Sequence, residues 1–201
     1  MNKVKKLPIV SSVIVGINVM VFIYCLFIDS KLYETGMLDA YRVLVCHEYG
    51  RIIWSLFLHA DVSHILSNML LLFFMGVMIE DELGHFRYLV LIFLSGTGGN
   101  LLSLLAKVLS GSMIPSIGAS GIVFGLDGVL LAMVLFWDRK MPTVTLSRVI
   151  LMILLSLYSG FSGENVDNAA HVGGLITGFL GGCAVCFLER RRRNKIRIYD
   201  N

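Results

Sequence analysis

Six long apolar runs occupy most of this 201-residue chain. They cover about residues 7–28, 62–79, 87–106, 117–137, 143–160 and 168–188. Each is close to the roughly 20 residues that a helix needs to cross about 30 Å of hydrocarbon. With 56% hydrophobic and 15% charged residues, the chain carries more apolar surface than a soluble domain of this length can bury. The sequence therefore predicts an all-α polytopic membrane protein with six transmembrane helices.

The basic residues indicate how these helices are oriented. If both termini and the second and fourth loops face the cytoplasm, that side holds 13 of the 17 Lys and Arg residues. The other side keeps Lys31, Arg42, Arg51 and Lys107. Because cytoplasmic segments of membrane proteins are enriched in Lys and Arg, we expect an N-in, C-in protein of the cell membrane with both termini cytoplasmic.

Outside the runs lie one long loop and a short tail. Residues 29–61 contain Tyr and Trp side chains that favour the headgroup layer, so we expect a folded outer loop resting in the interface. Residues 189–201 form a basic cytoplasmic tail, which we expect to contact anionic lipid headgroups and not nucleic acid. Because the sequence has no internal repeat or linker, residues 1–201 are expected to form a single domain. Nothing in the sequence indicates an oligomeric state.

Polar motifs lie near the start of three of the apolar runs, where polar atoms are costly. The motifs are His64-x-x-x-Asn68, Gly118-Ala119-Ser120-Gly121 and Ala170-His171 followed by Gly173, Gly174 and Gly178. Ionisable or strongly hydrogen-bonding groups inside a membrane span indicate a functional site by default. In the N-in topology all three runs begin at the outer face, and at 1.5 Å per residue these side chains share one shallow depth.

Small residues on the fourth and sixth runs predict a close helix contact. Stripes at three- or four-residue spacing are formed by Gly121, Gly125 and Gly128, and by His171, Gly174, Gly178 and Gly182. Such stripes allow two helix backbones to approach closely. This contact would bring Ser120 and His171 within hydrogen-bond reach, as a histidine base that activates a serine hydroxyl requires.

Acyl transfer by a serine also needs donors for the developing oxyanion. His64 and Asn68 are four residues apart and share one helical face, and the Ser120 backbone N–H adds a third donor. The three motifs, in this order and at these ends of the runs, resemble the rhomboid family of intramembrane serine proteases over about residues 45–190.

The resemblance implies a six-helix rhomboid-like bundle without metal or cofactor. It implies a serine endopeptidase that cleaves transmembrane segments of single-span membrane proteins near the outer face of the bilayer. Ser120 matches the family's nucleophile and His171 its general base, while His64 and Asn68 match its oxyanion-binding side chains. Supporting positions, which include the aromatic residue against the imidazole and a histidine that braces the outer loop, are Gly118, Gly121, Phe124 and His59. Gly76 and Glu80 match positions at the inner end of the second span.

Two features depart from the family pattern. The family commonly has Trp-Arg in the outer loop, whereas this chain reads Gly50-Arg51 with Trp54 one turn later. Asp127 lies seven residues after Ser120, and we expect a buried, hydrogen-bonded or protonated carboxyl whose partner is Thr177.

Two other functions are considered. The first is a non-catalytic rhomboid-like protein that binds membrane clients, which retention of both Ser120 and His171 disfavours. The second is a small transporter that uses Asp127. A transporter predicts several ionisable residues near mid-bilayer, and only Asp127 fits.

Overall fold

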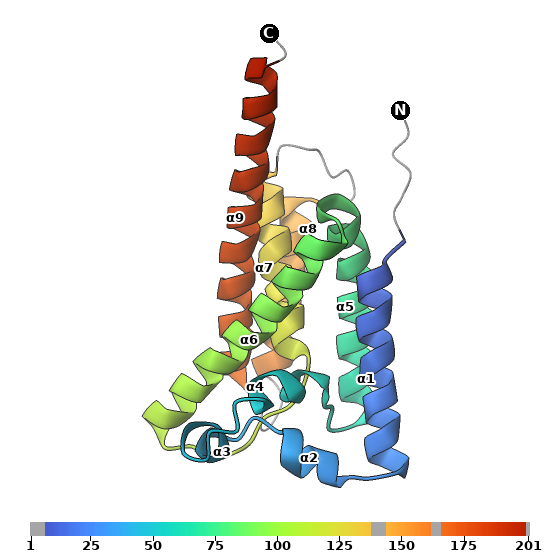
Figure 1. Cartoon of the computed structure of the whole chain (residues 1–201), viewed down its shortest axis with the longest axis vertical. Helices are drawn as coiled ribbons and strands as arrows, with labels where there is room; N and C mark the ends of the chain where they lie inside the picture. The colour runs from blue at the N-terminus through green and yellow to red at the C-terminus, as the bar shows by residue number, and fades with distance from the viewer. Residues whose placement is uncertain (1–6, 138–143, 162–165, 200–201) are drawn as a thin grey trace.

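The computed structural model describes residues 7–137, 144–161 and 166–199, and its elements in these ranges are helical (Figure 1). The helices, in chain order, are α1 (Ile9–Phe27), α2 (Lys31–Gly36), α3 (Ala40–Leu44), α4 (Arg51–Trp54), the 3-10 helix η1 (Ser55–Phe57), α5 (Val62–Leu83), α6 (His85–Ser110), α7 (Ser120–Phe136), α8 (Leu146–Phe161) and α9 (Asn168–Tyr199). The short helices α2, α3 and α4 gather at one end of the bundle, opposite both chain termini (Figure 1). We call this end the loop end.

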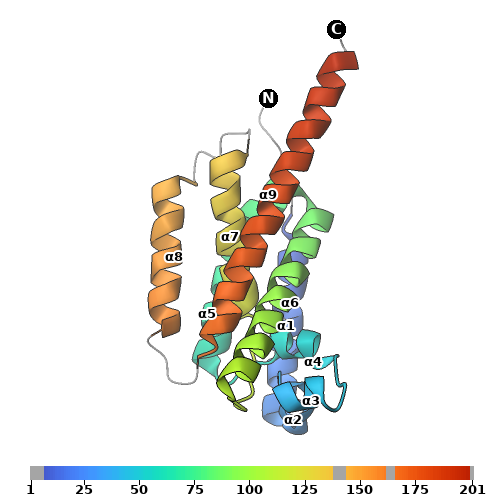
Figure 2. The same cartoon turned by 90° about the vertical axis from the view of Figure 1, so that its left-hand side faces the viewer.

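Helix α7 lies at the centre of the bundle. It packs against α5, α6, α8 and α9, and most of its residues from Gly121 to Met133 are buried. Helix α8 packs mainly against α7 and stands at the side of the bundle (Figure 2). Four helices of the described chain are long and apolar enough to span a membrane, namely α1, α5, α6 and α9, while α7 and α8 are shorter. The protein is therefore a multi-pass helical membrane protein.

The backbones of α7 and α9 approach each other at glycines. A Cβ atom added at Gly174 would lie 2.1 Å from the carbonyl oxygen of Gly121, and one added at Gly178 would lie 2.0 Å from that of Gly125. Carbon atoms cannot approach a backbone oxygen so closely, so only glycine fits at these two positions. The small-residue stripes of the sequence thus meet, and the contact fixes the distance between the two helices.

We expect Gly178→Ala to destabilise the protein, because the added methyl group would force α7 and α9 apart. Overpacking of this kind typically costs about 1–3 kcal/mol. Gly16→Ala in α1 is the matched control, since a Cβ atom there meets nothing within 4 Å. Thermal unfolding in detergent should show a lower Tm for Gly178→Ala and an unchanged or higher Tm for Gly16→Ala. Equal Tm values for the two variants would contradict the close contact.

Glu80 joins the far ends of α1 and α5. Its buried carboxylate accepts hydrogen bonds from the backbone N–H groups of Val10 (2.8 Å) and Ser11 (3.0 Å) and from the Ser11 hydroxyl (2.7 Å). His85 Nδ1 lies 2.6 Å from the same carboxylate. The first N–H groups of a helix have no partner within the helix, so Glu80 satisfies donors at the start of α1. This position is the one that the family resemblance assigned to bracing.

Arg51 holds the loop between α1 and α5 in place even though no tryptophan directly precedes it in the sequence. The side chain is only 5% exposed, and its Nη1 donates to the carbonyl oxygens of Glu34 (2.8 Å) and Met37 (3.0 Å). Its Nε donates to Glu48 at 2.6 Å, and this hydrogen bond lowers the pKa of the Glu48 carboxyl. Trp54 is 59% exposed and does not fill the interior. The guanidinium therefore ties the α2 region to α4.

The last helix runs further than the expected span. The sequence predicts a span over 168–188 and a tail beyond it, whereas α9 continues as one helix to Tyr199. Glu189 pairs with Arg87 of α6 (3.1 Å) and with Arg193 one turn later (3.6 Å). Such i,i+4 pairs favour helix outside the apolar segment.

Candidate active site

Ser120 is the first residue of α7, at the loop end of the bundle. The chain reaches it through Gly118, which has φ +127°, a conformation that residues with a side chain rarely adopt. Gly118 N–H donates to the carbonyl oxygen of Ser55 (2.9 Å), and Ala119 N–H donates to His59 Nε2 (3.4 Å). The backbone immediately before Ser120 is thus held by η1 and by His59.

His171 lies in the first turn of α9 and faces Ser120. Its Nε2 is 2.9 Å from Ser120 Oγ, and its side chain is buried. The Phe124 ring stacks on the imidazole with a centroid distance of 4.2 Å and an interplanar angle of 10°. In the described part of the chain, His171 Nδ1 has no hydrogen-bond partner. The structure therefore brings Ser120, His171 and Phe124 together, and no carboxylate of the described residues is bonded to the imidazole.

His64 lies beside the same turn. The Cε1 and Nε2 atoms of its ring would be 2.8 Å from a Cβ atom added at Gly118, and that Cβ atom would be 3.8 Å from Ser120 Oγ. Gly118 is thus required both for its backbone conformation and for the space that the His64 ring occupies. Asp61 caps α5 by accepting the His64 backbone N–H (2.9 Å), and this hydrogen bond lowers the pKa of the Asp61 carboxyl.

Asn68 follows His64 by one turn of α5. The side chain is 5% exposed, and its Nδ2 finds no hydrogen-bond partner within the described ranges. A buried amide donor without a partner is costly, and such groups in native proteins call for an explanation. An oxyanion that forms only during a reaction would supply the acceptor.

His59 is fully buried between η1 and α5. Burial, reinforced by the neighbouring His64, lowers the pKa of His59 to about 3. Its ring packs edge-on against His64 at 5.0 Å, and its backbone carbonyl accepts the Tyr33 hydroxyl at 2.7 Å. His59 is consequently neutral in the fold, as its role as acceptor for Ala119 N–H requires.

This burial gives the protein a predicted pH dependence. An unfolded chain takes up a proton at His59 below about pH 6.5, while the folded chain does not, so the free energy of unfolding falls as pH falls from about 6.5 towards 3. In His59→Gln, whose amide oxygen can still accept Ala119 N–H, we expect a smaller loss of Tm between about pH 7 and pH 5. The exposed His47 provides the control His47→Asn, which should keep the wild-type pH dependence. Identical pH profiles for all three proteins would refute the prediction.

The expected contact between Asp127 and Thr177 is wrong. The Thr177 hydroxyl donates to the carbonyl oxygens of Gly173 (2.7 Å) and Gly174 (3.1 Å) in its own helix, and the side chain lies against Gly98 of α6. Asp127 is buried, as expected, but neither carboxyl oxygen has a hydrogen bond of ordinary geometry within the residues described. The Ser156 hydroxyl of α8 is a polar group near it.

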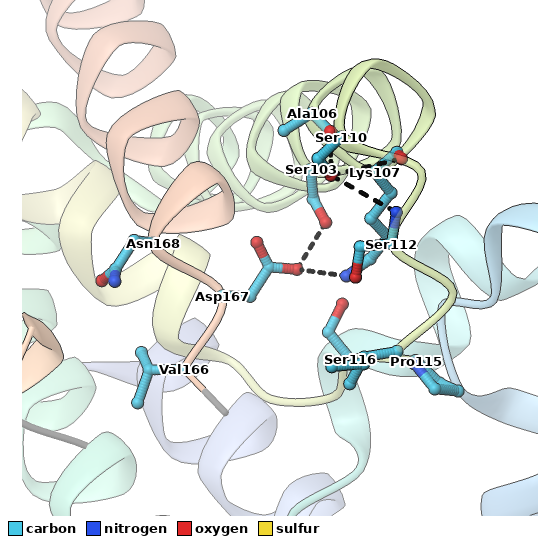
Figure 3. Close-up of a pocket in the computed structure, with 11 residues that line it drawn as sticks. Ser103, Ala106, Lys107, Ser110, Ser112, Pro115, Ser116, Val166, Asp167 and Asn168 are labelled. Atoms are coloured by element: carbon cyan, nitrogen blue, oxygen red, sulfur yellow. Dashed lines mark hydrogen bonds and ion pairs between the residues drawn. The ribbon is translucent and has the colours of Figure 1, made fainter. Parts of the chain in front are cut away.

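A polar cluster beside His171 was missed by the sequence analysis. Asp167, immediately before α9, contacts Ser103 and Lys107 of α6 at the edge of a cavity of about 190 Å³ (Figure 3). An aspartate directly before an apolar run is a typical helix N-cap signal, so the role of Asp167 as N-cap could have been predicted from the sequence. Its partners on α6 were not, because they lie 60 or more residues away along the chain. No three His, Cys, Asp or Glu side chains converge on a possible metal site in the described ranges.

These contacts define a class of site: a serine and a histidine in hydrogen-bond contact at one end of a membrane helix bundle. Comparison with known proteins agrees, since residues 47–187 match the rhomboid domain. The chain belongs to the rhomboid family. It is 39% identical over 153 residues to RHOMBOID-like protein 1 of Arabidopsis thaliana, and the matched residues cover 74% of this chain and 38% of that protein.

Two further relatives show the same pattern. Identity is 40% over 149 residues to RHOMBOID-like protein 4 of Arabidopsis thaliana, covering 73% of this chain and 36% of that protein. Identity is 35% over 139 residues to Rhomboid protease GluP of Bacillus subtilis, covering 69% of this chain and 26% of that protein. The matches thus span well under half of each of these relatives. At the level of the family, they support intramembrane proteolysis.

Proposed function

We propose that this protein is an intramembrane serine endopeptidase that cleaves transmembrane segments of single-span membrane proteins with a Ser120–His171 dyad. The contact of 2.9 Å between His171 Nε2 and Ser120 Oγ carries the proposal. A serine and a histidine side chain at a membrane helix contact have little reason to meet unless they act together. The relatives include a protein named a rhomboid protease, which supports the same activity.

In the proposed reaction, His171 Nε2 takes the proton of the Ser120 hydroxyl as its oxygen attacks the scissile carbonyl. The new C–O bond converts the carbonyl into a tetrahedral oxyanion. His171 then returns the proton to the leaving amine, which breaks the C–N bond and leaves an acyl group on Ser120. Water, deprotonated by the same imidazole, releases the acyl group and restores the hydroxyl. Phe124 keeps the imidazole plane in place by stacking on it.

The oxyanion is proposed to be bound by His64, by Asn68 and by the Ser120 backbone N–H. The unpartnered Asn68 Nδ2 and the position of the His64 ring at Gly118 support this assignment. Gly118 gives the turn its shape, and Gly121 lies where α7 meets α9, with its carbonyl oxygen close to Gly174. His59 holds the Ala119 N–H and so orients the peptide before Ser120.

We further propose that residues 1–201 form one domain with six membrane spans and with both termini in the cytoplasm. The termini lie at the same end of the bundle, and the dyad lies at the opposite, loop end (Figure 1). This arrangement agrees with an even number of membrane crossings and with an active site near the outer face. A substrate helix must unwind locally before a base-activated serine reaches its carbonyl groups, so clients with weak helix formers near the outer membrane edge are favoured.

The decisive experiment incubates the purified full chain in proteoliposomes with a model single-span substrate and maps any cut by mass. We expect one main cut near the outer edge of the substrate's membrane segment. A wild-type protein that binds this substrate without cutting it would instead support a non-catalytic client-binding protein.

Asn68→Ala should leave a slower but active enzyme, because His64 and the Ser120 N–H remain as donors. Loss of one oxyanion donor costs roughly 10²–10³ in kcat. The kinetic constants for the model substrate check this, with KM expected to change little. A loss confined to KM would show that Asn68 binds the ground state and would remove it from the oxyanion site.

A further inference from the structure

Asp167 caps the helix that carries His171. Its Oδ1 accepts the backbone N–H of Ala170 at 3.0 Å, and its carbonyl oxygen accepts the backbone N–H of His171 at 3.2 Å. The side chain of the residue before a helix normally satisfies one of the free N–H groups of the first turn in this way. Asp167 therefore fixes the turn from which the His171 imidazole projects.

The other carboxylate oxygen of Asp167 reaches a different helix. Asp167 Oδ2 accepts a hydrogen bond from the Ser103 hydroxyl and pairs with Lys107 Nζ at 3.1 Å (Figure 3). Ser103 and Lys107 lie one turn apart on α6. The side chains of Asp167 and Lys107 are 14% and 11% exposed, so the ion pair is largely withdrawn from solvent.

The carboxylate is charged in this position. Burial raises the pKa of Asp167, but the hydrogen bonds from Ser103 and Ala170 and the Lys107 charge outweigh burial and lower it overall. A withdrawn ion pair adds little net stability because desolvation offsets its attraction, whereas removing one partner leaves the other charge stranded. Such a pair mainly fixes the relative position of the two helices, because their separation would leave both charges without a partner.

The backbones of α6 and α9 also touch on both sides of His171. A Cβ atom at Gly99 would lie 2.6 Å from the carbonyl oxygen of Ala170, and one at Gly173 would lie 3.0 Å from that of Gly98. The first turn of α9 thus packs directly against α6. The Asp167 carboxylate adds a polar contact between the two helices just before this turn. In the residues that the structure describes, the imidazole contacts the Ser120 hydroxyl through Nε2, while its Nδ1 has no hydrogen-bond partner.

We propose that Asp167 is a positioning residue for His171, acting as a clamp that joins the first turn of α9 to Ser103 and Lys107 of α6. The inference rests on the proposed function, in which His171 is the general base. In a dyad without an acidic third member, the imidazole must be placed by its helix and by the Phe124 stack. Asp167 supplies the helix part of this placement without touching the reacting atoms.

The test compares Asp167→Ala, Asp167→Asn and Lys107→Met with wild type in proteoliposomes. Asp167→Ala removes both the cap and the ion pair, and a misplacement of about 1 Å costs roughly 100-fold. We expect kcat to fall roughly 10- to 100-fold, with KM changed by less than about twofold. Asp167→Asn keeps a cap oxygen for Ala170 N–H and should recover part of the lost rate.

Lys107→Met should also lower kcat, but it should have little further effect when combined with Asp167→Ala, because the two residues act through one contact. Ser120 labelling by a fluorophosphonate probe should slow in parallel with kcat, since labelling needs the His171 base but not the peptide substrate. The control is Asp39→Ala, which removes the cap of α3, where Asp39 accepts Arg42 N–H at 2.9 Å. This control should keep wild-type kcat and labelling.

Asp167→Ala with kcat and labelling both within about twofold of wild type would overturn the proposal. So would a fall in kcat with unchanged labelling, because the dyad would then be intact. If wild type neither cleaves nor labels, the proposed function fails, and hydrogen exchange decides the clamp separately. Exchange of the amides in residues 168–173 should be faster in Asp167→Ala than in wild type, and unchanged exchange would refute the clamp.

Discussion

Replacing Ser120 by alanine is expected to abolish cleavage while the protein keeps its fold. The hydroxyl that attacks the substrate is lost, whereas the residue that follows the Gly118 turn stays small. In soluble serine proteases, loss of the nucleophile costs roughly 10⁶-fold in kcat, and the remaining turnover comes from binding and oxyanion contacts. The rate on the model single-span substrate and the Tm should be measured together.

The matched control for this variant is Ser12→Ala. Ser12 is an exposed serine of α1 whose hydroxyl donates to the carbonyl oxygen of Pro8, the residue before this helix (2.7 Å). Both variants should melt close to wild type, and the control should cut at the wild-type rate. A fluorophosphonate should label wild type and Ser12→Ala but not Ser120→Ala. Robust proteolysis by Ser120→Ala would show that another residue is the nucleophile.

Changing His171 to alanine should remove activity to a similar depth, because the hydroxyl of Ser120 is a weak nucleophile without a base at 2.9 Å. The effects of replacing residues that act as one catalytic unit are not additive. The double variant Ser120→Ala/His171→Ala should therefore be no slower than either single variant. Labelling of Ser120 should also fail in His171→Ala, although the serine is present. Single-turnover cleavage and probe labelling measure these effects.

His47→Asn is the histidine control, because His47 is exposed and its backbone φ of 60° suits asparagine. It should leave cleavage unchanged. If His171→Ala kept most of its turnover, or if the double variant were much slower than both single variants, His171 would not be the base for Ser120.

The sequence predicts the helical class and the meeting of Ser120 with His171 for the same physical reason. Long apolar runs and small-residue stripes are local patterns, and the membrane allows few ways to pair helices that carry them. The stripe residues Gly174 and Gly178 do lie against Gly121 and Gly125 of α7. Two side chains at matching ends of paired helices are then forced to be neighbours.

The contacts that the sequence did not predict depend on how each helix is rotated about its axis, and so on which neighbouring helix each side chain faces. Asp127 was assigned to Thr177, but Thr177 lies on the side of α9 that faces α6, and Asp127 lies near Ser156 of α8. Depth along a helix follows from counting residues, whereas such side-to-side pairing depends on the packing of several helices at once. The Asp167 contact with α6 was missed for the same reason.

The backbone contact between α7 and α9 has a consequence for how the sequence of these two helices can vary. The two helices touch through glycines and carbonyl oxygens, so no side chain separates their backbones at Gly174 and Gly178. A larger residue at Gly174 or Gly178 would therefore disturb this contact. Helix α8 packs mainly against α7, and no residue of α8 is among the nearest neighbours of the described glycines. Laboratory evolution for new substrates should accordingly collect its productive substitutions on α8 and leave the glycines of α7 and α9 untouched.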